Sequence, residues 1–137
     1  MRVFMAGSES GLMIYIVEDD DSVRKGLSRL MRSAGFATQD FSSAEEFLAS
    51  ADTNEPGCVL LDITMPRLSG LQLQTEMNKR HIDLPVIAVS ARDDSDTRDM
   101  ARQLGARYFF RKPVDDQALI DAIQWLLAAD GIGTPQR

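Results

Sequence analysis

Five polar side chains stand directly after apolar segments of the sequence and could together handle a metal ion and a phosphoryl group. They are Glu18 and Asp19 after the first segment, Asp62 at the end of the third, Ser90 at the end of the fourth and Lys112 after the last. An aspartate can act as a nucleophile toward phosphorus. A lysine ammonium and a hydroxyl can stabilise the charge of a transferred phosphoryl group. The residue types therefore predict phosphoryl transfer to Asp62.

The three carboxylates indicate that this transfer depends on a divalent cation, because paired carboxylates repel each other unless a cation neutralises them. Mg²⁺ prefers oxygen ligands and retains several waters, so two carboxylates and one carbonyl suffice as protein ligands. We expect Asp19 and Asp62 to bind Mg²⁺ directly, with the backbone carbonyl of Thr64 as the third ligand. Glu18 would act through a bound water, and Mn²⁺ is an alternative ion.

Strands alternating with helices would bring these side chains together. Continuous apolar segments, typical of strands buried on both faces, occupy residues 12–17, 58–62 and 85–90. A more polar strand at 36–41 is expected at an edge, and residues 107–111 form the fifth strand. Helical periodicity covers residues 22–35, 42–50, 71–79, 97–104 and 115–130. This alternation predicts the α/β class, with a doubly wound five-stranded parallel sheet and five helices.

The strand ends also predict the order of the strands. Ligands of doubly wound sheets bind at the carboxyl ends of the strands, near the point where the strand order switches. The second strand ends at Phe41 and Ser42 and contributes no ionisable group there, unlike the other four strands. The order 2-1-3-4-5 places the second strand outside the site and brings the other four ends together.

Length and composition indicate one globular domain. The 137 residues are 44% hydrophobic and 26% charged, with a net charge of −6 that argues against direct binding of nucleic acid. No apolar run approaches the ~20 residues of a membrane span, so we expect no membrane partner. The only cysteine, Cys58, cannot form an internal disulfide, which favours a reducing cytoplasm.

The chain divides into three parts. Residues 1–11 are too short and too polar for a signal peptide, and we interpret them as a flexible leader or a remnant of recombinant expression. Residues 12–129 form the folded domain, and residues 130–137 form a C-terminal tail.

Four motifs at the strand ends resemble those of the receiver domain of bacterial two-component response regulators, which has the CheY-like, flavodoxin-like fold. The resemblance extends over residues 12–129, and the four motifs are highly specific when they occur together in this order. They are Ile16-Val17-Glu18-Asp19-Asp20, Leu61-Asp62-Ile63-Thr64-Met65-Pro66 followed by Gly70, Val89-Ser90-Ala91, and Arg111-Lys112-Pro113.

The resemblance implies a role for each site residue. Asp62 would accept phosphate from a sensor histidine kinase or a histidine phosphotransfer protein, while Glu18 and Asp19 serve the metal. Ser90 would be the switch hydroxyl and Lys112 would contact the phosphate, in a signalling domain that assists its own phosphorylation and slow dephosphorylation. We expect Thr64 and Arg92 to tune the dephosphorylation rate, because they lie near the route of the attacking water.

The resemblance also implies an output surface. Phe109 holds the aromatic switch position, where tyrosine is frequent, and Tyr108 is expected on the other face of the sheet. Phosphorylation would reshape the face formed by the fourth helix, fifth strand and fifth helix, which would contact an output domain or partner protein, with homodimerisation as a further outcome. The segment from Phe41 to Leu48 is similar to receivers attached to LuxR-type output domains. Lys112-Pro113 is expected to be cis.

Two other classes of function share part of this pattern. A dehalogenase-type phosphatase combines a strand-end Asp with a Ser or Thr and a Lys, but it requires a second Asp two positions after the nucleophile, where this chain has Thr64. A flavodoxin-like flavin or nucleotide binder needs a hydroxyl-rich or Gly-rich loop after the first strand. This chain has four consecutive acids there, from Glu18 to Asp21, which would repel phosphate without a metal.

Several side chains are expected to have structural positions only. Cys58 should be a small core residue, and His81 should lie at the surface near a helix end. The helical pattern places Val23 and Met100 on the apolar faces of their helices. Trp125, at the margin of the last helix's apolar face, is expected to pack against the core, and the alternative is a half-exposed residue on a partner surface.

Overall fold

A computed structural model describes residues 12–54, 56–65, 68–92 and 94–129 of the chain, so the predicted leader and tail lie outside the described residues. In these ranges five strands alternate with five helices, as the sequence predicts. The elements are β1 (Met13–Val17), α1 (Asp21–Ser33), β2 (Ala37–Phe41), α2 (Ala44–Ser50), β3 (Gly57–Asp62), α3 (Gly70–Lys79), β4 (Val86–Ser90), α4 (Ser95–Gln103), β5 (Ala106–Arg111) and α5 (Asp116–Ala129).

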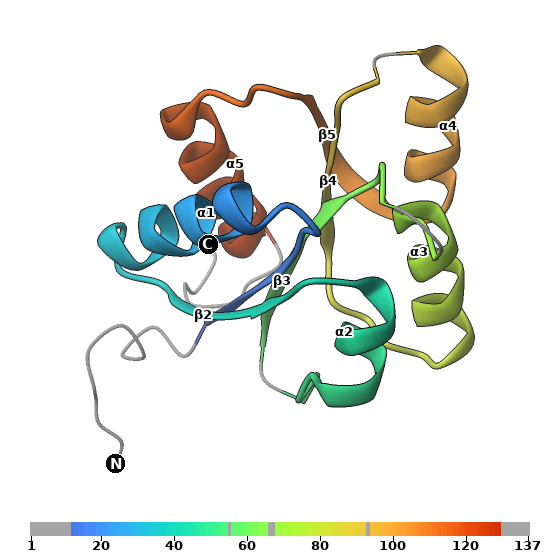
Figure 1. The fold of residues 1–137 in the computed structure, drawn as a ribbon, viewed down its shortest axis with the longest axis horizontal. Coiled ribbons are helices and arrows are strands. Elements are labelled where there is room, and N and C mark those ends of the chain that lie inside the picture. Colours follow the sequence, from blue (N-terminus) through green and yellow to red (C-terminus); the bar gives the residue numbers. More distant parts are fainter. Residues whose placement is uncertain (1–11, 55, 66–67, 93, 130–137) are drawn as a thin grey trace.

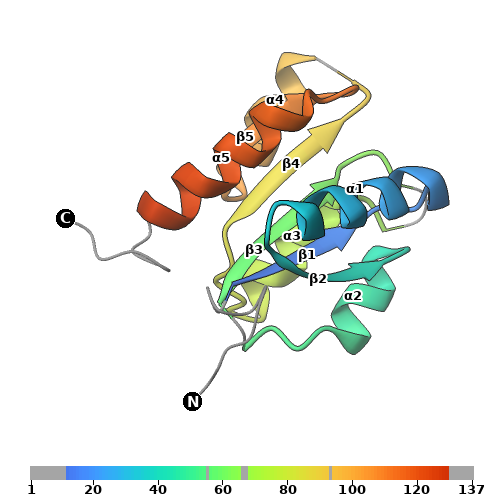
Figure 2. The same ribbon diagram turned by 90° about the vertical axis from the view of Figure 1, so that its left-hand side faces the viewer.

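The strands form a single parallel sheet in the order β2-β1-β3-β4-β5. This confirms the predicted strand order and the position of β2 at an edge. Helices α1 and α5 cover one face of the sheet, and α2, α3 and α4 cover the other (Figure 1). Figure 2 looks onto the face that carries α1 and α5, with the strands running behind them. The architecture is therefore a three-layer α/β fold.

Each central strand contributes to two hydrophobic cores, one on each face of the sheet. In β1, Tyr15 and Val17 pack toward α2, α3 and α4, whereas Ile14 and Ile16 pack toward α1 and α5. Successive side chains of a strand point to opposite faces, so a strand covered on both faces must be apolar throughout. The helices complete the cores with Phe47, Leu73, Met77 and Ala101 on one side and Met31, Leu119, Ile123 and Leu126 on the other.

Side-chain caps set the beginnings of the helices. The Asp20 carboxylate accepts a hydrogen bond from the backbone N–H of Val23 at 3.0 Å, so α1 begins at Asp21, one residue before the predicted start. The Ser43 hydroxyl accepts from the N–H of Glu46 and caps α2, which begins at Ala44. The Asp115 carboxylate accepts from the N–H of Ala118 at 2.9 Å at the predicted start of α5. These bonds satisfy backbone donors that the first helical turn leaves unpaired.

The sequence did not predict the cap of α3. Ser69 and Gln72 form a reciprocal capping box there, so α3 begins at Gly70, one residue before its predicted start.

Two predictions about helix faces are wrong. Trp125 is 70% exposed and Met100 is 47% exposed, although both were expected to pack inward. Each is an immediate neighbour of a buried residue, Leu126 and Ala101 respectively, and one residue along a helix is a rotation of about 100°. Val23 lies on the predicted face of α1 with Leu27 and Leu30, and it is 38% exposed because it lines a groove beside α5.

Gly70 allows the start of α3 to lie directly against the end of β3. A Cβ atom at this position would lie 2.6 Å from Ile63 Cα and 2.7 Å from the Asp62 carbonyl oxygen. The backbone N–H of Gly70 donates to the Ile63 carbonyl at 3.1 Å, which fixes this contact. Any larger residue would therefore displace the backbone next to Asp62.

We predict that Gly70→Ala lowers the free energy of unfolding by about 1–3 kcal/mol, because the added methyl group overpacks the contact between α3 and β3. The matched control is Gly26→Ala in α1, where a Cβ would meet no atom within 4 Å. The control should raise the free energy of unfolding by about 0.5–1 kcal/mol through helix propensity. Urea unfolding measures both values, and equal stability of the two variants would contradict the assigned role of Gly70.

Candidate functional site

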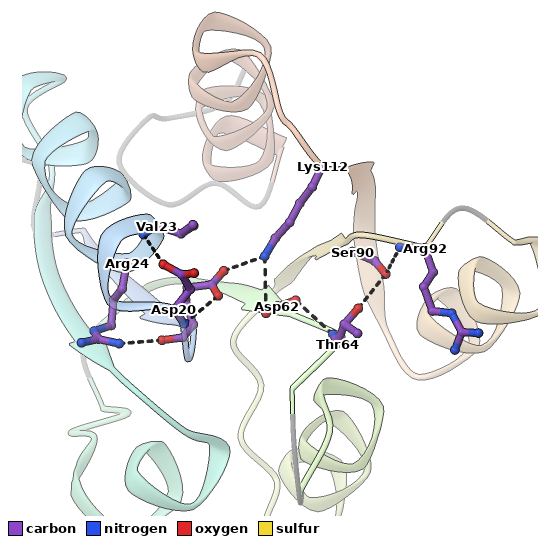
Figure 3. Close-up of polar contacts among 9 residues, drawn as sticks. Asp20, Val23, Arg24, Asp62, Thr64, Ser90, Arg92 and Lys112 are labelled. Atoms are coloured by element: carbon purple, nitrogen blue, oxygen red, sulfur yellow. Dashed lines mark hydrogen bonds and ion pairs between the residues drawn. The ribbon is translucent and has the colours of Figure 1, made fainter.

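The carboxyl ends of four strands bring the predicted site residues together (Figure 3). Glu18 follows β1, Asp62 ends β3, Ser90 ends β4 and Lys112 follows β5. Glu18, Asp62 and Ser90 are buried, with exposed fractions of 2%, 4% and 0%, whereas Asp19 is exposed. The edge strand β2 ends at Phe41 and contributes no ionisable side chain to this cluster.

Three carboxylates form the acidic part of the site. Glu18, Asp19 and Asp62 can each offer one oxygen, and these oxygens lie within 4.8 Å of one another. The Lys112 ammonium lies 3.0 Å from Glu18 Oε1 and 3.5 Å from Asp62 Oδ2. One positive charge thus faces three carboxylates. A set of carboxylate oxygens with two uncompensated negative charges fits a hard divalent cation such as Mg²⁺ or Mn²⁺.

Burial and the neighbouring negative charge of Glu18 disfavour the ionised form of Asp62. Burial raises the pKa of Asp62 to about 7, and the negative charge of Glu18 adds to this rise. The Lys112 charge and the hydrogen bond from the Thr64 N–H act in the opposite direction. Burial alone would lower the pKa of Lys112, but its hydrogen bond to Glu18 and the charge of Asp62 raise it above its ordinary value. Lys112 therefore remains an ammonium, and its single positive charge does not neutralise the three carboxylates.

The backbone and the side chain of Glu18 both form hydrogen bonds. Its backbone N–H donates to the Phe41 carbonyl at 3.0 Å, which extends the sheet by one bond. Its carboxylate accepts from the Asp20 N–H at 3.1 Å and from Lys112. Its carbonyl accepts from the Arg24 guanidinium at 2.9 Å. Sequence reasoning missed Arg24, because a backbone carbonyl acceptor leaves no mark on the residue pattern.

Hydroxyl groups form the other side of the site. The Thr64 N–H donates to Asp62 Oδ1 at 3.0 Å, and the Thr64 hydroxyl shares a hydrogen bond of 3.1 Å with the Ser90 hydroxyl. The Ser90 oxygen also accepts from the Arg92 N–H at 3.0 Å. The sequence predicted that Thr64, Ser90 and Arg92 lie near the site, but not that the two hydroxyls bond each other.

The last strand places Tyr108 and Phe109 on opposite faces of the sheet, as predicted. Phe109 packs against the core under α2, α3 and α4, and the Arg98 guanidinium lies 6.0 Å from its ring centroid. Tyr108 packs against the core of the opposite face. The Lys112-Pro113 peptide is cis, which confirms that prediction.

Two further predictions about single residues are confirmed. Cys58 is fully buried in the core and His81 is exposed, and both were predicted. Pro66, part of one motif, lies outside the described residues.

An apolar groove opens beside the site, between α1 and α5. Its volume is about 600 Å³, and Lys112 lies at its border with the acidic cluster. Val23, Leu27 and Leu30 of α1 face Val114 and Leu119 across it. The groove therefore joins the charged pocket to an apolar contact surface.

No helix among the described residues combines the length and the hydropathy needed to span a membrane.

Comparisons with known proteins agree with this geometry. A family model described as "Response regulator receiver domain" matches residues 14–124. Transcriptional regulatory protein FixJ of Azorhizobium caulinodans is 37% identical over 113 residues, covering 82% of this chain and 54% of that protein. Response regulator protein TodT of Pseudomonas putida is 37% identical over 117 residues, covering 85% and 52%. The chain thus spans about half the length of these curated relatives.

Solved structures give the same result. The response regulator StyR superposes with a TM-score of 0.80 at 37% identity, covering 88% of this chain and 62% of that one. The crystal structure of FixJ-N superposes with a TM-score of 0.77 at 34% identity, covering 82% and 90%. Chemotaxis protein CheY4 of Vibrio cholerae, at 19% identity and a TM-score of 0.78, supports the fold alone. The chain therefore belongs to the response regulator receiver domain family, the signalling domains of two-component systems.

Proposed function

We propose that this chain is a phosphorylation-activated switch that accepts a phosphoryl group on Asp62 from a sensor histidine kinase or a histidine phosphotransfer protein. One observation carries the proposal: the buried Asp62 carboxylate lies within 4.8 Å of two other carboxylates and 3.5 Å from the Lys112 ammonium. This combination of an acidic cation site, a nucleophile and a fixed positive charge is what phosphoryl transfer requires.

The proposed transfer uses the residues of the pocket in separate roles. An Asp62 carboxylate oxygen attacks the phosphorus of a phosphohistidine; the new O–P bond forms as the N–P bond breaks, and the electron pair of that bond stays on the imidazole nitrogen. Lys112 and the Ser90 hydroxyl bind oxygens of the transferred group. A bound Mg²⁺, or Mn²⁺ in its place, supplies charge neutralisation. Asp19, Asp62 and the Thr64 carbonyl would hold this ion, and Glu18 would contact it through water.

The switch follows from a change of partner at Ser90. The Ser90 hydroxyl shares a hydrogen bond with Thr64, and donation to a phosphoryl oxygen would give it a new partner. We propose that Ser90 then moves toward Asp62 and Phe109 turns inward behind it. The movement shifts a two-state equilibrium and reshapes the face formed by α4, β5 and α5.

The reshaped face would contact an output domain or a partner protein, and phosphorylation could also favour a homodimer through it. The curated relatives FixJ and TodT are about twice the length that this chain matches, and FixJ is named a transcriptional regulator. We therefore propose a cytoplasmic protein whose signal reaches an output module, with a DNA-binding module of the LuxR type as the candidate. The kinase partner would reach Asp62 from the open edge, where the apolar groove beside Lys112 offers a contact surface.

An aspartyl phosphatase is the less well supported alternative. Its general acid would stand at position 64, where the Thr64 hydroxyl instead bonds Ser90. A threonine hydroxyl is too weak an acid to replace a carboxyl group in that role. Self-dephosphorylation of Asp62 should therefore be slow.

Asp62→Asn should abolish phosphorylation by acetyl phosphate in the presence of Mg²⁺, because an amide is a poor nucleophile toward phosphorus. Intact-protein mass spectrometry measures the bound phosphate. Asp40→Asn, which removes an exposed carboxylate of β2, is the matched control and should be phosphorylated like the wild type. Normal phosphate incorporation in Asp62→Asn would rule out Asp62 as the acceptor.

Removal of Mg²⁺ should reveal the repulsion among the carboxylates. The pKa of Asp62 is raised from 3.8 to about 7 in the folded state, so this group lowers the stability as the pH rises from about 4 to about 7, and the loss is complete above that range. In Mg²⁺-free buffer at about pH 8, Asp62→Asn should be more stable than the wild type, by at most about 4 kcal/mol for a pKa shift of this size, and the difference is measured as a higher Tm.

The same thermal scans with Mg²⁺ test the cation site. Mg²⁺ should raise the Tm of the wild type, because a ligand that binds only the folded state stabilises it, and should affect Asp62→Asn much less. An equal Tm increase in both proteins would show that the ion binds away from Asp62.

Thr64 and Arg92 should control the lifetime of the phosphorylated state. Both side chains are exposed beside Asp62 and Ser90, on the side open to water. Replacing both by alanine should shorten the lifetime about fivefold, the effect of about 1 kcal/mol on the hydrolysis barrier. The decay of phosphorylated protein after removal of the donor measures this lifetime. Thr75→Ala, an exposed position on α3, should leave it unchanged. An unaltered lifetime in the double variant would refute this assignment.

A further inference from the structure

A single guanidinium connects the end of β1 to the beginning of α1. Arg24 Nη1 donates to the Glu18 carbonyl at 2.9 Å (Figure 3), and Nη2 pairs with the Asp21 carboxylate. The Arg24 side chain is only 13% exposed, whereas that of Asp21 is 75% exposed. The guanidinium is thus mostly withdrawn from solvent and spans the turn between the strand and the helix.

The turn that Arg24 closes carries an essential part of the acidic cluster. Asp19 lies between two anchored residues, Glu18 and Asp20. The carbonyl of Asp20 accepts from the Arg24 backbone N–H at 2.8 Å, and its side chain caps α1 at Val23. The Arg24 side chain therefore fixes the backbone before Asp19, at Glu18, while the first helical turn of α1 fixes the backbone after it, at Asp20.

The ion pair with Asp21 does not account for this arrangement. An exposed pair three residues apart on a helix contributes little to stability. It would also leave the other arm of the guanidinium in solvent. Instead that arm binds a carbonyl six residues earlier, outside the helix, at the strand end that carries the metal-site carboxylates.

We propose that Arg24 is a positioning residue for the cation site: it holds the turn from Glu18 to Asp20 so that the Asp19 carboxylate faces Asp62. This inference rests on the proposed function, because it assumes that Asp19 and Asp62 bind a divalent cation. Arg24 itself would not touch the ion. It acts on the direction of a ligand, as outer partners of metal ligands do.

Positioning and simple electrostatics predict opposite effects of removing Arg24. The guanidinium is a positive charge close to a site for a positive ion, so its removal should strengthen Mg²⁺ binding if charge alone mattered. If Arg24 positions Asp19, its removal should weaken binding despite the lost repulsion. The direction of the change in affinity therefore separates the two explanations.

The experiment is isothermal titration of Mg²⁺ into the wild type, Arg24→Met, Arg24→Lys and Asp21→Asn, with circular dichroism to verify folding. Arg24→Met should bind Mg²⁺ about tenfold more weakly than the wild type. Asp21→Asn, the matched control, removes the exposed pair but leaves the bond to the Glu18 carbonyl, and it should change the affinity less than about twofold.

A second readout distinguishes positioning from general damage. In Arg24→Met the Mg²⁺ concentration for half-maximal phosphorylation by acetyl phosphate should rise, while the maximal rate at saturating Mg²⁺ stays within about twofold. If Arg24→Met does not fold, Arg24→Lys decides the question, because it keeps the charge and loses the two-armed contact. Its affinity for Mg²⁺ should then be several-fold below that of the wild type.

Unchanged or tighter Mg²⁺ binding in a folded Arg24 variant would overturn the inference while leaving the proposed function intact. A loss as large in Asp21→Asn as in Arg24→Met would also overturn it, because the exposed ion pair would then be the cause. Failure of the wild type to bind Mg²⁺ would refute the proposed cation site itself, and this inference with it.

Discussion

Repulsion among three carboxylates is the constraint on which this structure depends. The oxygens of Glu18, Asp19 and Asp62 converge within 4.8 Å, and the ammonium of Lys112 compensates only one of the three charges. The remaining imbalance is visible in Asp62, whose pKa is raised to about 7 by burial and by the charge of Glu18. The pocket is thus built to receive positive charge, which a divalent cation would supply before a phosphoryl group arrives.

The sheet holds these groups together against their repulsion. Backbone bonds continue the ladder just past the strand ends, from the Ile63 N–H to Val89 and from the Lys112 N–H to Ser90, each at 2.8 Å. Gly70 lets α3 lie against the backbone of Asp62 and Ile63, and the Arg24 guanidinium binds the Glu18 carbonyl at the end of the neighbouring strand. The exposed Thr64 and Arg92 lie in the loops that follow β3 and β4. The buried site residues are therefore positioned by strand ends, and exposed loop residues lie beside them.

The sequence predicted the topology because central parallel strands must be apolar on both faces, and because polar residues right after such strands mark one edge of the sheet. It was less reliable for single helix faces. Met100 and Trp125 are exposed although the next residue of each helix, Ala101 or Leu126, is buried. Helix propensity does not show which of two adjacent apolar residues faces the core. The start of α3 was off by one residue because its apolar pattern is irregular, and the helix is followed by His81 at a φ of 58° where glycine is usual. The contacts of Arg24 and the bond between Thr64 and Ser90 depend on the path of the backbone in space, which residue types alone do not fix.

The most direct test of the central claim is a crystal structure of the protein with Mg²⁺ and beryllium fluoride, a mimic of the phosphoryl group. We expect the fluoride group on an Asp62 carboxylate oxygen, a metal ion bound by Asp19 and Asp62, and contacts from Lys112 and Ser90 to the fluorine atoms. A metal ion bound elsewhere, or an unmodified Asp62 beside a fluoride group carried by another residue, would contradict the account.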